Sequence, residues 1–132
     1  MPLPDRMFRF LRSNKHYTES SGKVDTKAFE PPKKTPPRED GFFELSVDWD
    51  DDTGVLPKIK ERKEATAVVA LHRENLDSLS SGPAGIPNGV LTYERAALDD
   101  NPHHGNLLVL AEAPLQDRMR TYRLLATLAV RV

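Results

Sequence analysis

The chain has 132 residues, a formal net charge of −1 at pH 7 and no cysteine. This length suits one domain with a modest core, and the near-neutral charge disfavours general polyanion binding, which needs a surplus of Lys and Arg. The absence of cysteine excludes disulfides, thiolate zinc sites, iron–sulfur clusters and cysteine nucleophiles. The apolar runs are too short for a membrane span, and the first ten residues lack the apolar core of a secretion signal. We therefore expect a cytoplasmic protein with no membrane partner.

The first part of the chain alternates short strand-like segments with turns. Residues 6–12 interleave arginines with Met and Phe, and we predict a strand there because turn-forming residues follow soon after. Residues 16–18 and 23–29 are expected to form a loose ribbon around the Ser-Ser-Gly turn at 20–22. Residues 30–41 contain four prolines and form a polar, proline-rich connection at the surface.

Residues 42–49 give the strongest strand signal in the first half of the chain. Apolar and polar side chains alternate there with a period of two, so one face is buried and Glu44, Ser46 and Asp48 lie on the other. The acidic turn that follows is similar to the start of an EF-hand calcium loop. However, the twelfth position counted from Asp48 is Ile59, whose side chain has no oxygen ligand, so we reject a calcium loop.

The second half of the chain supplies two predicted helices and the remaining strands. A short helix, capped by Asp52 or Thr53, is predicted for 55–64. A buried strand is expected at 65–71, emerging at the surface over 72–79, and a turn-rich loop follows at 80–89. Two further strands are expected at 90–97 and 107–111. The chain then forms an amphipathic helix at 115–132, with Pro114 as an early helical residue. Together these predict one α+β domain over residues 1–132. It has a mainly antiparallel sheet of about five strands, one short helix and a packed C-terminal helix.

The polar connection between the last two predicted strands holds two of the four histidines. Asp99, Asp100, His103 and His104 are residue types that bind zinc or iron. Adjacent histidines on extended backbone point to opposite sides, and the chain has no His-x-His or His-x-x-x-His spacing to bring two of them together. We therefore predict no metal site, and the chain carries no nucleotide-cofactor motif, so we expect no cofactor.

A second group of polar residues comes from separate segments. His16, Ser46, Asp48 and His104 would converge if the strands at 42–49 and 90–111 share one sheet. Histidine beside a carboxylate provides general acid–base capacity near neutral pH, so we take these four as candidate catalytic residues. The candidate ligand-binding residues are Arg9, Asp100, Asn101 and His103.

Arginines near aromatic residues form a third group, at the two ends of the chain. Its members are Arg6, Arg9, Arg12, Arg118, Arg120 and Arg123, with Phe8, Phe10 and Tyr122 among them. Such side chains can stack on bases or hold phosphates. They are also typical of a solvated face whose stems cover apolar surface.

Short blocks in a fixed order resemble a group of small uncharacterised bacterial proteins. The blocks are Arg9, His16-Tyr17, Gly22-Lys23-Val24, Ala28-Phe29, Leu45-Ser46-Val47-Asp48 and Asn101-Pro102-His103-His104. The group has no established activity, so the resemblance implies a bacterial source but no function. It singles out His16, Phe29, Ser46, Asp48, Asn101 and His104 as positions to test.

These features lead to three hypotheses of function. The first is a non-catalytic binding or regulatory module that acts through a protein partner, based on the exposed proline-rich and arginine-rich segments. The second is a small His/Asp-dependent enzyme acting on a nucleotide or phosphodiester, including ADP-ribosyl transfer by Arg9, Ser46 and Glu94. The third is nucleic-acid binding, which needs the two arginine groups to meet on one surface.

Overall fold

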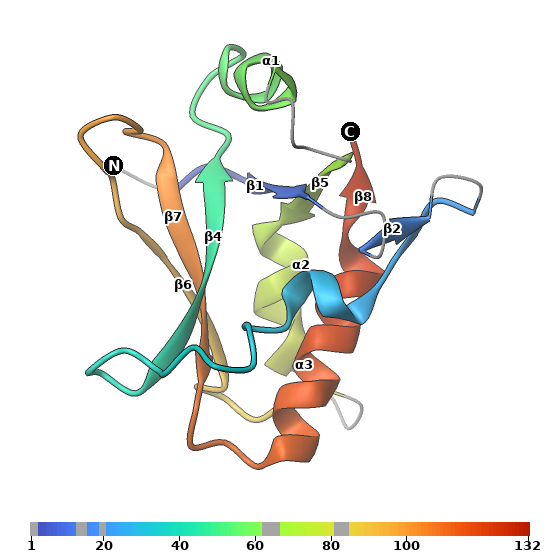
Figure 1. The fold of residues 1–132 in the computed structure, drawn as a ribbon, viewed down its shortest axis with the longest axis vertical. Coiled ribbons are helices and arrows are strands. Elements are labelled where there is room, and N and C mark those ends of the chain that lie inside the picture. Colours follow the sequence, from blue (N-terminus) through green and yellow to red (C-terminus); the bar gives the residue numbers. More distant parts are fainter. Residues whose placement is uncertain (1–2, 13–15, 19–20, 62–66, 81–84) are drawn as a thin grey trace.

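The computed structural model describes residues 3–12, 16–18, 21–61, 67–80 and 85–132. Within these ranges one six-stranded antiparallel sheet has the order β6-β7-β4-β1-β5-β8, and β2 and β3 form a separate ribbon (Figure 1). The strands are β1 (Arg6–Leu11), β2 (Tyr17–Thr18), β3 (Lys23–Val24), β4 (Phe42–Trp49), β5 (Ala67–His72), β6 (Leu91–Arg95), β7 (His104–Leu110) and β8 (Val130–Arg131). The predicted α+β class is confirmed, with six strands in the main sheet where about five were expected.

The helical elements are short except for the last. They are η1 (Thr26–Phe29), α1 (Val55–Lys60), α2 (Arg73–Asp77), η2 (Ser78–Ser80) and α3 (Leu115–Leu128). The predicted continuation of the first α-helix over 62–64, and parts of the predicted turns at 20–22 and 80–89, lie outside the described residues. The connection at 30–41 contains neither helix nor strand.

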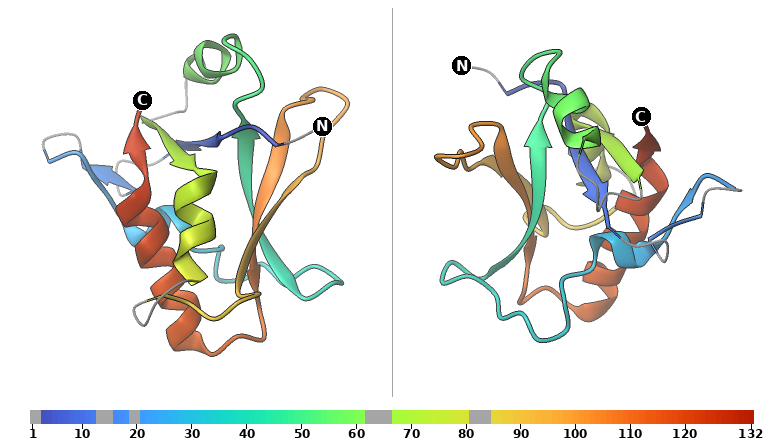
Figure 2. Two further views of the ribbon diagram at one scale, coloured as in Figure 1. Left: turned by 180° about the vertical axis from the view of Figure 1, so that it is seen from behind. Right: turned by 45° about the horizontal axis from the view of Figure 1, so that its top comes forward.

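Two apolar clusters lie on opposite faces of the sheet because β1 alternates its side chains between them. Met7 and Leu11 belong to the larger cluster, together with residues of η1, α2 and α3. Phe8 belongs to the smaller cluster, where it packs with Val55 and Ile59 of α1. The helices α2 and α3 therefore lie on one side of the sheet and α1 on the other, as the two further views in Figure 2 also show.

The C-terminal helix begins at Leu115 as predicted, but the prediction was wrong about its end and about Pro114 as a helical residue. Pro114 precedes α3 as its N-cap residue, and the helix ends at Leu128, after which Ala129 is extended (φ −68°, ψ 130°). Val130 and Arg131 then pair with Ala70 and Val69 of β5 and add the sixth strand. Pairing with a distant strand overrides the local helical pattern there.

Two other local predictions were also wrong. The helix α1 begins at Val55 with Gly54 as its N-cap, and neither Asp52 nor Thr53 caps it. Asp52 Oδ1 instead accepts a hydrogen bond from the Gly54 N–H at 2.8 Å. The segment expected to emerge as a strand after residue 72 forms α2 over Arg73–Asp77.

A fork between β1 and β4 is the feature of the sheet that positions the candidate site. β1 pairs with β5 from Arg6 to Leu11. By contrast β1 and β4, both described in full, pair only at Met7↔Trp49 and Phe8↔Asp48. Beyond Phe8 the two strands separate, and the Arg9 side chain bridges them by donating to the Ser46 carbonyl oxygen.

None of the helices in the described ranges is both long and apolar enough to cross a bilayer. Crossing requires about 20 predominantly apolar residues. The longest described helix, α3, has 14 residues and carries three arginines.

Candidate functional site

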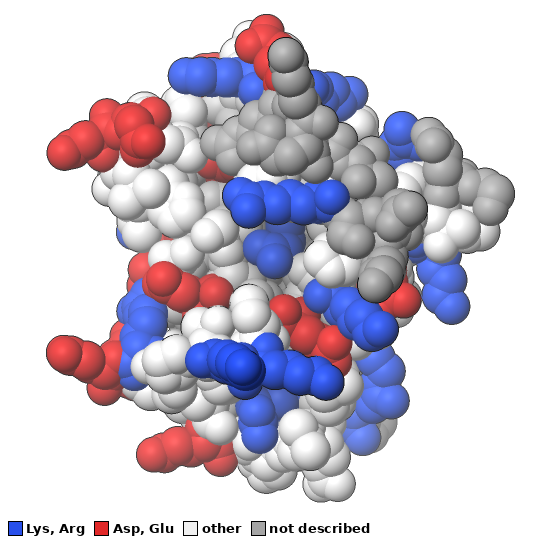
Figure 3. Space-filling model, viewed as in Figure 1, with Lys and Arg blue, Asp and Glu red and all other residues white. Residues whose placement is uncertain are grey.

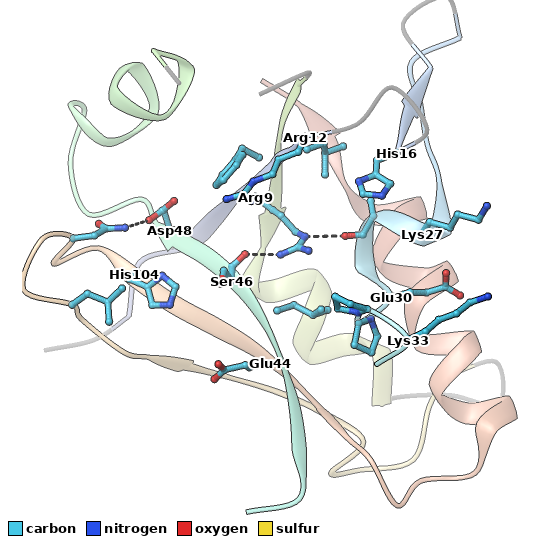
Figure 4. A pocket seen from close by; sticks show the side chains of 18 of the residues that line it. Arg9, Arg12, His16, Lys27, Glu30, Lys33, Glu44, Ser46, Asp48 and His104 are labelled. Atoms are coloured by element: carbon cyan, nitrogen blue, oxygen red, sulfur yellow. Dashed lines mark hydrogen bonds between the residues drawn. The ribbon is translucent and has the colours of Figure 1, made fainter. Parts of the chain in front are cut away.

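The fork between β1 and β4 opens into a cavity of about 740 Å³ that most of the candidate residues line. These are His16, Ser46, Asp48 and His104, together with Arg9, Asp100 and Asn101. They come from β1, the start of the β2–β3 ribbon, β4, β7 and the connection between β6 and β7 (Figure 4). The expectation that strands 42–49 and 90–111 share one sheet holds, since β4 pairs directly with β7.

Arg9 is held rigidly at the centre of the cavity wall. Its Nε donates to the Ala28 carbonyl at 2.9 Å, and its Nη1 donates to the Ser46 carbonyl at 2.7 Å (Figure 4). The guanidinium also lies 5.7 Å from the centre of the Phe29 ring. A guanidinium has five N–H donors in a planar fork, so these two bonds fix its orientation and leave donors for a ligand.

The charge of Arg9 is not compensated by a carboxylate in the described part of the chain, where the ion pairs involve other residues. Burial lowers the pKa of Arg9 to about 10, and the nearby charge of Arg12 adds to the effect. Arg9 therefore remains cationic at neutral pH in a partly dehydrated position. An anion bound at this point would form charge-assisted hydrogen bonds that are stronger than those between neutral groups.

Further cations lie around the same cavity. Arg12, Lys27 and Lys33 contribute to its wall, with Glu30 among them. Figure 4 shows Lys27 and Lys33 on the η1 side of Arg9, and Ser46, Asp48 and His104 on the β4–β7 side. On the face shown in Figure 3, Lys and Arg side chains extend across the middle, and acidic side chains are prominent toward the β6–β7 edge. The site is thus basic on one side and acidic on the other.

Asp48 is buried, which the sequence did not predict. Its side chain lies on the same sheet face as Phe8 and His104, its partners on β1 and β7, and the residue is 6% exposed. Asn101 donates from Nδ2 to Asp48 Oδ1 at 2.6 Å. In the described ranges Asp48 takes part in no ion pair. A buried carboxylate held by an amide retains acceptor capacity for a ligand or a water.

The connection between β6 and β7 is a compact, ordered turn. Leu98 and Asn101 exchange backbone hydrogen bonds of 2.9 and 3.1 Å. Asn101 Oδ1 also accepts from the His103 N–H at 3.2 Å. Asp100 is exposed and lines the cavity from this turn. The turn thereby fixes Asn101 over Asp48.

The two adjacent histidines point to different places, as the sequence predicted. His104 lines the cavity. The His103 ring instead meets Asp51, with Nδ1 and Oδ2 2.6 Å apart, and Asp51 also pairs with Arg95. The hydrogen bonds from Arg95 and then His103 lower the pKa of Asp51 against the opposing effect of burial. His103 therefore anchors the turn. It is absent from the lining of this cavity and lines a neighbouring one. β7 begins at His104, earlier than the predicted strand at 107–111. The polar connection between β6 and β7 is therefore shorter than predicted.

Glu94 is not brought together with Arg9 and Ser46, as ADP-ribosyl transfer would require. It is absent from the cavity lining. Its carboxylate accepts from Arg38 at 3.1 Å and from Asn106 at 3.2 Å. Hydrogen bonding by Arg38, ahead of the other causes, lowers the pKa of Glu94. Arg38 also reaches Glu44 at 3.2 Å, which offsets an acidic charge on the cavity rim.

Three of the arginines near the two chain ends make structural contacts outside the cavity. Arg6 pairs with Asp50 at 2.7 Å, and Arg118 donates to the Ala113 carbonyl at 3.0 Å. Arg120 donates to the Gly85 carbonyl at 3.3 Å. None of the residues from α3 lines the cavity. These contacts give structural roles to three of the six arginines proposed for nucleic-acid binding.

Several residues of the cavity were not predicted as site residues. Lys27, Glu30, Lys33 and Leu98 line it. In the sequence these lysines look like ordinary solvated charges near a proline-rich connection, and Leu98 looks like a single apolar residue in a loop. Only the fold places them beside β4. Among the described residues, no three His, Asp or Glu side chains are grouped in a way that would hold a metal ion.

Comparison with known proteins gives no guide to the function. No protein-family model matches the chain, and no curated protein or solved structure matches it significantly. The function is therefore inferred from the cavity and its chemistry.

Proposed function

We propose that the protein binds a small phosphate-bearing molecule in the cavity, with Arg9 as the anchor of the phosphate group. The observation that carries this proposal is the arrangement of Arg9. Two backbone carbonyls orient its guanidinium, and no carboxylate of the described chain pairs with it. A pre-oriented guanidinium fork matches phosphate geometry and costs little entropy on binding.

The other cations support the same ligand class. Arg12, Lys27 and Lys33 lie around Arg9 and raise the local positive potential. His16 and the exposed Leu98 complete the rim. A concave site with a few convergent polar groups is typical of small-molecule binding. A protein partner remains an alternative to this ligand, and we further propose that the protein is bacterial and cytoplasmic.

A matched pair of lysines tests this proposal. Lys33 lines the cavity and Lys34 does not, and both are exposed. We expect Lys33→Ala to weaken binding of phosphate monoesters and nucleotides by about 2- to 5-fold at low salt, as for the loss of an exposed charge interaction. We expect Lys34→Ala to leave binding unchanged.

Isothermal titration calorimetry with a panel of such ligands measures the dissociation constant of each ligand for the wild type and for the two lysine variants. The control for nonspecific charge loss is Arg123→Ala, on the exposed side of α3. The proposal fails if no ligand of the panel binds the wild-type protein. It also fails if Lys33→Ala and Lys34→Ala weaken binding equally.

Hydrolysis of the bound phosphoester is a second candidate function, favoured by the position of Asp48. The buried carboxylate lies in the same cavity as Arg9, directly across the β4–β7 pair from His104. A carboxylate or imidazole there can take a proton from a water that attacks phosphorus. As the bond from phosphorus to the ester oxygen breaks, that proton passes to the ester oxygen, which leaves as an alcohol. Arg9 would stabilise charge on the phosphoryl oxygens.

Turnover of the ligands that bind can be followed by ³¹P NMR. We expect Asp48→Asn, which keeps the size of the side chain, to reduce the rate about 100-fold or more because it removes a proton acceptor. His72→Gln is the matched control, since His72 is exposed and lines neither this cavity nor the one beside it. Equal rates for the wild type and Asp48→Asn would refute this role.

A further inference from the structure

A second cavity adjoins the first and shares part of its wall. It has a volume of about 310 Å³ and lies against α1. Asp48, Asp100 and Asn101 line both cavities. The two cavities therefore meet at these residues and can be occupied by one elongated ligand.

The second cavity differs from the first in its chemistry. Its α1 side is formed by the apolar Val55 and Ile59 together with Lys58 and Glu61, and His103 lines it from the turn before β7. The carboxylates of Asp48 and Asp100 lie where this cavity meets the one that Arg9 lines. Carboxylates accept hydrogen bonds from hydroxyl groups and repel phosphate, so a second phosphate is disfavoured here. The residues instead suit an uncharged group with hydroxyls and a flat apolar face.

We infer that the ligand is a nucleoside phosphate, with its phosphate on Arg9 and its nucleoside in the second cavity. This inference rests on the proposed binding of phosphate at Arg9. The ribose hydroxyls would donate to Asp48 and Asp100, the acceptors at the junction. The base would pack against the aliphatic carbons of Val55 and Ile59. A nucleoside monophosphate combines these groups in the order in which the two cavities present them.

Adjacent aspartates provide the test. Asp100 lines both cavities, whereas Asp99 lines neither, and both are exposed in the same turn. Calorimetric titrations would compare AMP, UMP, ribose 5-phosphate and inorganic phosphate on the wild type, Asp100→Ala and Asp99→Ala. We expect the wild type to bind a nucleotide at least 10-fold more tightly than inorganic phosphate. Asp100→Ala should weaken nucleotide binding about 5- to 10-fold without weakening phosphate binding, and Asp99→Ala should change neither.

The outcomes separate this inference from the function on which it rests. Binding of inorganic phosphate and both nucleotides with equal affinity would overturn the nucleoside assignment and leave the phosphate site standing. Equal effects of Asp100→Ala and Asp99→Ala on nucleotide binding would also overturn it. If none of the four compounds binds the wild type, both the phosphate site and the nucleoside assignment are wrong.

Discussion

Gly105→Ala should destabilise the protein by about 2–4 kcal/mol, the combined effect of overpacking and a lost hydrogen bond. The Trp49 indole lies across Gly105 and donates from Nε1 to the Glu94 carbonyl oxygen at 3.2 Å. A Cβ at position 105 would collide with the indole and would lie 2.5 Å from that carbonyl oxygen. Because the oxygen belongs to the backbone of β6, it cannot move aside without disturbing the sheet. Urea unfolding measures the change in the free energy of unfolding.

Gly54→Ala is the matched control for Gly105→Ala. A Cβ at position 54 would meet only the flexible Asp52 carboxylate, at 3.1 Å, and the backbone there has an ordinary conformation (φ −86°). We expect a change of no more than about 1 kcal/mol. Equal stability of Gly105→Ala and the wild type would contradict the described packing of Trp49 over β7.

Arg9→Met should weaken phosphate binding by about 10- to 100-fold, because hydrogen bonds to a charged group contribute about 1.5–3 kcal/mol. The substitution should also reduce stability by about 1–3 kcal/mol, since the Ala28 and Ser46 carbonyls lose their donor. Calorimetry measures the affinity, and thermal unfolding shows whether the variant is folded at the titration temperature.

Two further variants separate loss of the site from loss of the fold. Arg9→Lys keeps the charge but lacks the planar fork, so we expect intermediate affinity. Arg123→Met removes an exposed arginine outside the cavity and should bind like the wild type. The role of Arg9 would be refuted if a folded Arg9→Met variant bound phosphate compounds as tightly as Arg123→Met.

Local sequence patterns predicted features that depend on neighbouring residues in the chain. The alternation in 42–49 predicted β4, and extended backbone predicted that His103 and His104 diverge. The first follows from strand geometry, which depends on neighbouring residues alone. The histidines diverge for another reason, because His103 lies in the turn before β7 and its ring meets Asp51. The grouping of Ser46, Asp48 and His104 also follows once β4 and β7 pair.

Features that depend on distant partners could not be read from the sequence. The end of α3 at Leu128 is set by pairing of β8 with β5, while the helical pattern itself continues. The burial of Asp48 depends on Asn101, 53 positions later in the chain. The position of Arg9 in the site depends on the fork between β1 and β4. From the sequence pattern alone, Arg9 cannot be told apart from Arg6 and Arg12, which lie in the same predicted strand.

The most direct test of the phosphate site is a map of amide chemical-shift changes in ¹⁵N-labelled protein titrated with AMP. We predict saturable shifts at residues 9–12, 27–33, 44–48, 55–61 and 98–104, which surround the two cavities, and unchanged amides over 118–128 in α3. Saturable shifts confined to α3 or to the outer edge of β6, or no shifts at millimolar AMP, would contradict the proposed site.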